Sequence, residues 1–161
     1  MDIEIFVEIP KGSKQKYELD EETGKIKLDR TLHGPMYFPF EYGFINETLG
    51  EDEDPLDVVL LSSFPTFPGC LVDADVVGVL EMEDEAGIDH KIIAVPKTKI
   101  DPRFSDIKNI EDVPKHMKKE IKDFFENYKN LEPEKWVKLK DFKSKQEAEK
   151  IVEESLKRKK E

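Results

Sequence analysis

The chain has 161 residues, of which 37% are hydrophobic and 39% are charged, and its formal net charge at pH 7 is −11. A chain of this length is most simply one domain, covering residues 1–161. The negative charge argues against non-specific binding to nucleic acid or to an anionic membrane, because both partners attract positively charged surfaces.

The first 30 residues predict three short strands. Residues 3–9 alternate apolar and acidic side chains, a pattern typical of a half-buried strand and unlike the basic and then apolar start of a signal peptide. Residues 16–19 and 25–30 flank a turn that contains Gly24, which predicts a hairpin. No apolar run reaches the roughly 20 residues of a membrane span, so we expect a soluble, cytoplasmic protein with no membrane partner.

The middle of the chain predicts further strands joined by irregular turns. Residues 34–46 are rich in aromatic residues, prolines and glycines, and indicate a packed loop that returns to extended structure. Strands are expected at 56–62, 71–82 and 91–96, with Gly78 as a bulge in the second of them.

The only cysteine, Cys70, excludes an intrachain disulfide and fits a reducing compartment. Its place after a Pro-Gly turn predicts a small buried residue.

After residue 100 the hydrophobic period becomes helical. We expect Asp112 to cap a helix that has Pro114 in its first turn. The apolar face of this helix would be Met117, Ile121, Phe124, Phe125 and Tyr128. A strand at 135–142 should follow.

A second helix should begin at a capping box formed by Ser144 and Glu147. Its buried stripe would be Ala148, Ile151, Val152 and Leu156. Many short strands followed by a helix, a strand and a helix favour a small closed or partly closed barrel with helices outside it. An open α+β sheet is the alternative.

The segment "GEDEDPLDVVLL", residues 50–61, places several acids beside a strand that reads as buried. Asp52 and Asp54 would share one face of an extended segment, and Pro55 would let Asp57 turn toward the same space. Crowded carboxylates oppose each other's ionisation unless solvent or a cation compensates, and three of them suit a hard divalent cation. A solvated acidic loop is the alternative.

An EF-hand does not fit this segment, because Asp57 and Ser63 occupy the positions that need Gly and Glu. A second acidic turn, "DEAGID" at 84–89, follows the strand at 71–82. If the strands at 56–62 and 71–82 pair, the two acidic turns meet on one rim. Such a basin for several metal ions is typical of phosphoryl chemistry.

Few basic residues accompany these acids, since residues 51–90 hold 12 acids and no Lys or Arg. Lys16, Arg30, Lys91 and Lys129 are the candidates for binding phosphate, and Arg30 offers a planar fork that matches phosphate oxygens. Taken singly, each lysine reads as a solvated surface residue.

Together these segments resemble the soluble family I inorganic pyrophosphatases. The matching segments run in order along nearly the whole chain: "VEIP", "KYELD", "MYFPFEYGFIN", "EDEDPLDVV", "DEAGIDHK", "FFENYK" and "KWVKL". Within them, "DEDPLDV" carries the DxDPxD signature of the family. The resemblance implies a mainly β, α+β fold, a five-stranded barrel similar to an oligonucleotide-binding (OB) fold with flanking α-helices.

The resemblance also implies an activity and its cofactors. The reaction would be Mg²⁺-dependent hydrolysis of inorganic pyrophosphate to two orthophosphates, with several ions per site and Mn²⁺ or Zn²⁺ as substitutes. Prokaryotic members of the family are commonly homohexamers, so a homo-oligomer is expected.

The resemblance assigns roles to particular acids. Asp52, Asp57 and Asp89 would bind an activating metal ion, and Asp57 would share a second ion. Asp84 and Asp89 would bind an ion that arrives with substrate, and Glu18 a further one. Glu8 and Glu85 would be supporting acids.

By the same resemblance, Asp54 would be the general base toward the attacking water. Six side chains would hold the phosphoryl groups: Lys16, Arg30, Tyr42, Lys91, Tyr128 and Lys129. Arg30, Tyr42 and Lys129 would also take part in catalysis.

Three positions depart from the family pattern: Phe38, Glu41 and Glu53. Phe38 stands where many members carry a tyrosine, so one hydroxyl near the phosphates is either missing or supplied by another residue such as Tyr37. These departures bear on substrate affinity more than on activity. His33, His90 and His116 receive no role.

Two other classes of function remain open from the sequence. One is a barrel that binds a ligand and holds Ca²⁺ structurally, although a face for single-stranded nucleic acid would need basic grooves. The other is a phosphoesterase acting on nucleotides or sugars. Phosphate release from these substrates separates the three classes.

Overall fold

The computed structural model describes residues 1–161 and consists mainly of β-structure, with two α-helices and two short 3₁₀ turns. The strands are β1 Asp2–Ile9, β2 Gln15–Asp20, β3 Lys25–Thr31, β4 Glu41–Ile45, β5 Asp57–Leu60, β6 Leu71–Asp84, β7 Gly87–Ile88, β8 Lys91–Pro96 and β9 Val137–Lys143. The helical elements are η1 Pro102–Phe104, η2 Ile110–Asp112, α1 Lys115–Asn127 and α2 Lys145–Lys160. None of the helices is long and apolar enough to cross a membrane.

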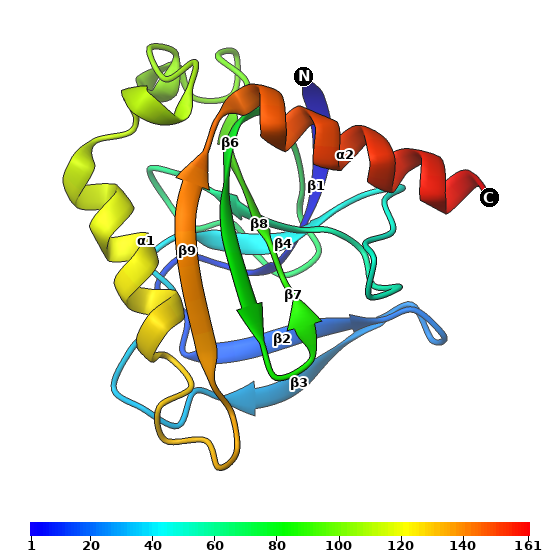
Figure 1. Ribbon diagram of the computed structural model, residues 1–161, viewed down its shortest axis with the longest axis vertical. Coiled ribbons are helices and arrows are strands. Elements are labelled where there is room, and N and C mark those ends of the chain that lie inside the picture. The colour runs from blue at the N-terminus through cyan, green and yellow to red at the C-terminus, as the bar shows by residue number, and fades with distance from the viewer.

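Five strands close into a barrel in the order β1-β4-β5-β8-β6, because β6 also pairs with β1. Only the β5–β8 pairing is parallel. The long strand β6 extends beyond the barrel, where it pairs with β7 and β9, and the β2–β3 hairpin forms a separate two-stranded sheet below (Figure 1). The predicted barrel with flanking helices is therefore confirmed, and the open sheet is wrong.

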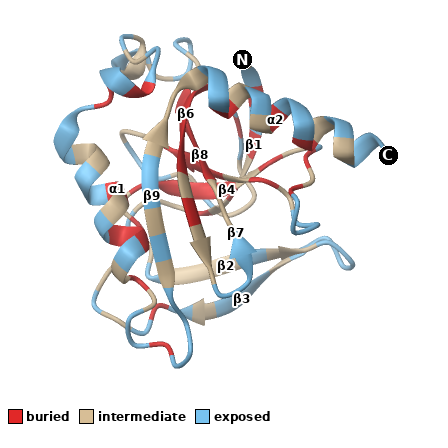
Figure 2. Ribbon diagram, viewed as in Figure 1, coloured by how far each residue is buried: buried red, intermediate tan, exposed pale blue.

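The core has two parts because the central strands are buried on both faces. Alternate residues of β5 and β8 enter different clusters, with Val58 and Ile92 in one and Val59 and Ile93 in the other. The first cluster draws on all five barrel strands and on the inner face of α2. The second, rich in aromatic residues, lies under α1. Figure 2 shows this burial concentrated in the barrel strands, whereas the outer faces of the helices are exposed.

Glycine is required where two barrel strands approach closely. At Gly43 of β4, a Cβ atom would lie 1.9 Å from the Phe6 carbonyl oxygen of β1. At Gly78, the register between β6 and β8 shifts, which confirms the predicted bulge. A Cβ atom there would lie 2.8 Å from the Cβ atom of Ile110.

Two local predictions were wrong. Asp112 does not cap α1: its carboxylate accepts the backbone N–H groups of Lys108 and Asn109 at 2.9 and 3.0 Å and closes the preceding 3₁₀ turn, and α1 begins after Pro114. The strands at 56–62 and 71–82 do not pair, because β8 lies between β5 and β6.

The start of the last helix was predicted correctly, although only the Ser144 half of the predicted capping box forms. The Ser144 hydroxyl accepts the Glu147 backbone N–H at 3.2 Å, and α2 follows directly. Ala148 and Val152 of the predicted stripe are buried.

Candidate active site

One open cavity of about 810 Å³ lies between the barrel, the β2–β3 hairpin and the end of α1. All the side chains predicted from the sequence line it: Glu8, Lys16, Glu18, Arg30, Tyr42, Asp52, Asp54, Asp57, Asp84, Glu85, Asp89, Lys91, Tyr128 and Lys129. They come from seven separate parts of the chain, so the fold is what gathers them.

The first acidic segment reaches this cavity as a tight turn rather than as extended chain. The Gly50 N–H donates to the Asp54 carbonyl at 2.7 Å, and the Asp54 N–H donates to Asp52 Oδ1 at 3.1 Å. Glu53 has a left-handed φ of 69°. The expectation of strand alternation was therefore wrong, although Asp52 and Asp54 both line the cavity.

The two acidic segments meet through Lys91, the first residue of β8. Its Nζ lies 2.7 Å from Asp57 Oδ2 and 2.8 Å from Asp89 Oδ2, and its side chain is only 3% exposed. Burial opposes the charge, but Asp57, Tyr42 and Asp89 hold the pKa of Lys91 well above its usual value. The parallel pairing of β5 and β8 explains the arrangement, because both strands begin at the same end of the barrel.

Several acids in the cavity are hard to ionise. Burial, Asp52 and Asp57 raise the pKa of Asp54. Burial raises the pKa of Glu8 to about 7, although its carboxylate accepts the Leu19 N–H at 2.8 Å. Burial also raises the pKa of Asp89, against the effect of Lys91. This crowding of negative charge favours any cation that enters.

A second group of charges in the cavity centres on Lys129. Lys129 Nζ, at the end of α1, lies 3.3 Å from Asp84 Oδ2 and 3.9 Å from Glu85 Oε1. Lys135 Nζ also lies 3.2 Å from Glu85 Oε1. Tyr128 is held by its ring, which stacks on Phe124 with centroids 5.0 Å apart.

Arg30 and Lys16 come from the β2–β3 hairpin, which forms one wall of the cavity while the barrel forms the other. Arg30 Nη1 donates to Asp29, whose Oδ2 also lies 3.5 Å from Lys16 Nζ. Arg30 Nε lies 3.0 Å from Glu132 Oε1. Sequence reasoning missed Asp29 and Glu132, because nothing in the spacing of the chain shows that the loop after α1 returns to the hairpin.

The donor set fits a divalent metal ion by its chemistry. The candidate ligands are all carboxylates, the hard oxygen donors that Mg²⁺ and Ca²⁺ prefer. No three Asp, Glu, His or Cys side chains are yet arranged as a metal centre, and Lys91 and Lys129 neutralise part of the carboxylate charge.

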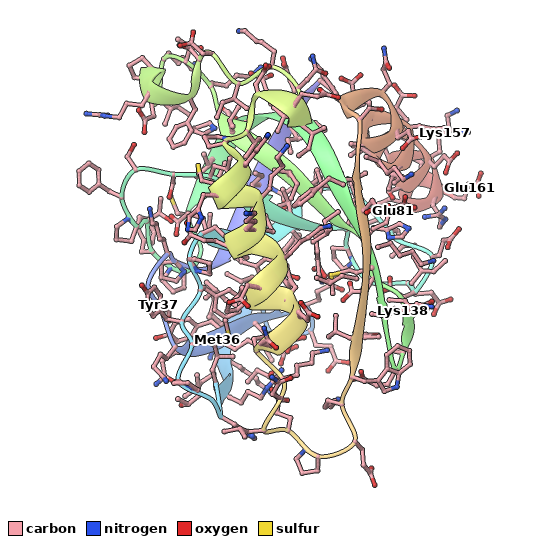
Figure 3. All side chains as sticks on the ribbon, turned by 60° about the vertical axis from the view of Figure 1, so that its left-hand side comes forward. Met36, Tyr37, Glu81, Lys138, Lys157 and Glu161 are labelled. Atoms are coloured by element: carbon pink, nitrogen blue, oxygen red, sulfur yellow. The ribbon has the colours of Figure 1, made fainter.

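Of the residues that depart from the family pattern, Phe38 lies in the cavity and Glu41 lies outside it. Phe38 lines the cavity, and its ring lies 4.6 Å from the Phe124 ring, centroid to centroid. Tyr37 instead projects from an outer loop (Figure 3), is 57% exposed and does not line the cavity. Tyr37 therefore does not replace the missing hydroxyl in this structure. Glu41 is fully buried away from the cavity, where it accepts the backbone N–H groups of Lys11 and Thr66.

The three histidines and Cys70, the other residues considered in the sequence, lie outside this cavity. His90 Nδ1 accepts the Met82 N–H at 3.2 Å, and His33 and His116 are exposed. Cys70 is half-buried, so the prediction of a buried cysteine was only partly correct.

A barrel with carboxylates, lysines and an arginine around one cavity defines a class of enzyme that acts on anionic substrates. The comparisons name the family. The sequence model described as inorganic pyrophosphatase matches residues 5–160. Inorganic pyrophosphatases of Nanoarchaeum equitans and Saccharolobus solfataricus are 50% and 48% identical to the chain, covering 96% and 99% of it and 96% and 92% of their own sequences.

Solved structures agree with the sequence comparisons. The inorganic pyrophosphatase of Helicobacter pylori superimposes with a TM-score of 0.97 at 48% identity, covering 99% of this chain and 94% of that one. That of Thermus thermophilus gives 0.96 at 45% identity, covering 99% and 92%. The chain belongs to the inorganic pyrophosphatase family, and it is an enzyme of the diphosphatase class of hydrolases.

Proposed function

We propose that the protein hydrolyses inorganic pyrophosphate to two orthophosphates in the cavity, in a Mg²⁺-dependent reaction with Asp54 as general base. One observation carries the proposal: every acid and base that the resemblance assigns to this reaction lines the same cavity. Two alternatives, a structural Ca²⁺-binding module and an esterase for nucleotides or sugars, have no observation of their own in their favour.

Five carboxylates would hold the metal ions: Asp52, Asp57, Asp84, Asp89 and Glu18. Bound divalent ions supply positive charge to the phosphoryl oxygens and lower the pKa of coordinated water. Hard oxygen donors favour Mg²⁺, with Mn²⁺ or Zn²⁺ as substitutes.

Positive side chains would bind the two phosphoryl groups. Lys91 and Lys129 remain protonated, since nearby acids and tyrosines raise their pKa values against the effect of burial. Arg30 adds a planar fork that matches phosphate oxygens. Lys16, Tyr42 and Tyr128 complete the set, and the buried rings of the two tyrosines fix their hydroxyl groups.

Asp54 is suited to accept a proton from the attacking water. Its pKa is raised by burial, Asp52 and Asp57, and a base with a higher pKa takes a proton more readily. It makes no ion pair with any of the lysines in the structure, so its oxygens remain available.

Phosphate release tests this proposal directly. The purified protein is given pyrophosphate, a nucleoside monophosphate or a sugar phosphate, each with Mg²⁺ and with excess chelator. We expect release from pyrophosphate alone, and none in chelator. Release chiefly from a monoester would identify an esterase, and no release from any substrate would favour a binding module.

We also propose that the enzyme works in the cytoplasm as a homo-oligomer, with a hexamer favoured. The family resemblance motivates this. Exposed apolar side chains on one stretch of the chain support it, since Phe64, Phe67 and Leu71 are more than half exposed and large exposed apolar groups mark interaction surfaces.

A further inference from the structure

Glu132 is a buried acid to which the proposed reaction gives no role. It lies in the loop after α1, where its backbone N–H donates to the Lys129 carbonyl at 2.9 Å. Only 8% of the residue is exposed, and it does not line the cavity. The turn that follows Lys129 therefore places a carboxylate behind the cavity wall.

The only cation within ion-pair distance of Glu132 is Arg30. Its Nε lies 3.0 Å from Glu132 Oε1, but the N–H is not aligned for a hydrogen bond, and the buried Oε2 has no donor at all. An isolated carboxylate is strongly disfavoured in a protein interior unless it is paired. The guanidinium of Arg30 is thus what compensates the charge of Glu132.

Asp29 holds the same guanidinium from another side. Arg30 Nη1 donates to Asp29 Oδ2, so two of the three nitrogens of the guanidinium are in contact with acids. Nη2 has no protein partner, and Arg30 lines the cavity. These contacts therefore leave the Nη2 edge of the Arg30 guanidinium free to donate hydrogen bonds.

We propose that Glu132 is a positioning residue, which orients the Arg30 guanidinium so that its free edge meets a phosphoryl oxygen. The inference rests on the proposed function, in which Arg30 binds pyrophosphate. A group that is already oriented loses less conformational freedom when the ligand binds. The effect of Glu132 should consequently fall on KM for pyrophosphate more than on kcat.

A purely structural role for Glu132, anchoring the loop to the hairpin, makes a different prediction. Loss of an anchor would lower the stability of the fold. Its effect on KM would be the same whether or not residue 30 is an arginine. Loss of a positioning residue should have no further effect on KM once the guanidinium fork is gone. Coupling between positions 30 and 132 therefore separates the two roles.

The kinetic experiment uses Glu132→Gln, which keeps the shape of the side chain and removes its charge. We expect KM for pyrophosphate with Mg²⁺ to rise about ten-fold, the size of one coupled contact, with kcat within about three-fold of wild type. Glu134→Gln, an exposed acid in the same loop, is the matched control and should leave KM unchanged.

In an Arg30→Lys background, Glu132→Gln should add nothing to KM. An additive rise there, or an unchanged KM in the single variant, would overturn the inference.

A second readout needs no activity. The chain has three arginines, Arg30, Arg103 and Arg158, so their Nε–H resonances can be assigned by substitution. In the wild type, the Arg30 Nε–H should exchange with water more slowly than that of Arg103, whose side chain is 68% exposed. In Glu132→Gln, but not in Glu134→Gln, this resonance should shift and exchange faster.

Equal exchange of Arg30 and Arg103 in the wild type would contradict the inference even if Glu132→Gln failed to fold. The two proposals also fail in different ways. A wild-type protein that releases no phosphate from pyrophosphate refutes the proposed function, while the resonance still reports on the Glu132–Arg30 pair.

Discussion

The buried ammonium of Lys91 shows, at the scale of single residues, how the protein tolerates its crowded acids. Its contacts with Asp57 and Asp89, at 2.7 and 2.8 Å, neutralise charge where the two acidic segments meet. No lysine contacts Asp54, whose pKa is raised by burial and by its acidic neighbours. The aspartates of "DEDPLD" therefore have different surroundings, which supports different roles.

Substitution of Asp54 should separate proton transfer from metal binding. Because a positioned base contributes roughly 10²–10⁴-fold, Asp54→Asn should lower turnover by about two decades or more and keep most of the affinity for the first Mg²⁺. Asp57→Asn should instead weaken Mg²⁺ binding itself. Calorimetry with Mg²⁺ and phosphate-release assays measure both. Equal loss of metal affinity in the two variants would make Asp54 a ligand.

Glu8 should make the stability of the metal-free protein depend on pH. Burial raises its folded pKa to about 7 from an ordinary 4.5, so the folded state binds a proton more tightly than the unfolded state. Stability should therefore fall as pH rises from about 4.5 to about 7 and then level off. At 1.36 kcal/mol per pKa unit, the penalty above pH 7 is about 3 kcal/mol at most.

Glu8→Gln should remove this penalty, because an amide can still accept the Leu19 N–H. Urea unfolding in excess chelator should show the variant more stable than wild type at pH 8 and equal to it at pH 4. The exposed control Glu22→Gln should follow the wild-type curve. A variant less stable than wild type at pH 8 would mean that ionised Glu8 is stabilising.

At the scale of elements, local patterns predicted most of the strands and both helices. Alternation in β1, turn residues in the β2–β3 hairpin and the Ser144 cap of α2 are each encoded within a few neighbouring residues. The insertion of β8 between β5 and β6 is not local, so the predicted pairing of β5 with β6 was wrong. For the same reason the contact of Glu132 with Arg30, across 102 positions of the chain, escaped prediction.

The close approach of β1 and β4 should make Gly43 one of the least replaceable residues. Gly43→Ala would bring a Cβ atom against the Phe6 carbonyl, and because backbone cannot move aside cheaply, we expect a loss of roughly 3 kcal/mol or more in unfolding free energy. Gly34→Ala, with open space around its Cβ position, should change stability by about 0.5 kcal/mol or less. Urea denaturation measures both, and similar values would contradict the close packing.

At the scale of the whole molecule, the barrel supplies one wall of the cavity and the separate hairpin the other. Barrel strands and their loops carry most of the acids and Lys91, whereas Lys16, Glu18 and Arg30 come from the hairpin. That these residues line one cavity could be predicted from their motifs. Their mutual contacts could not, because they depend on how the hairpin, the α1–β9 loop and the barrel meet.

The proposed oligomer is a property of the whole molecule that light scattering can test. Because Phe64 and Phe67 are exposed in the isolated chain, association that covers them would remove apolar surface from water. We expect a mass corresponding to a hexamer at micromolar concentration. A monomer at every Mg²⁺ concentration would contradict the proposal.

The central claim is that pyrophosphate and its metal ions bind in this one cavity. A crystal structure with Mg²⁺ and a non-hydrolysable pyrophosphate analogue tests it most directly. We expect the analogue to contact Arg30, Lys91 and Lys129, with metal ions on Asp52, Asp57 and Asp89 and none on Asp54. An analogue bound outside the cavity, or a metal ion coordinated by Asp54, would contradict the account.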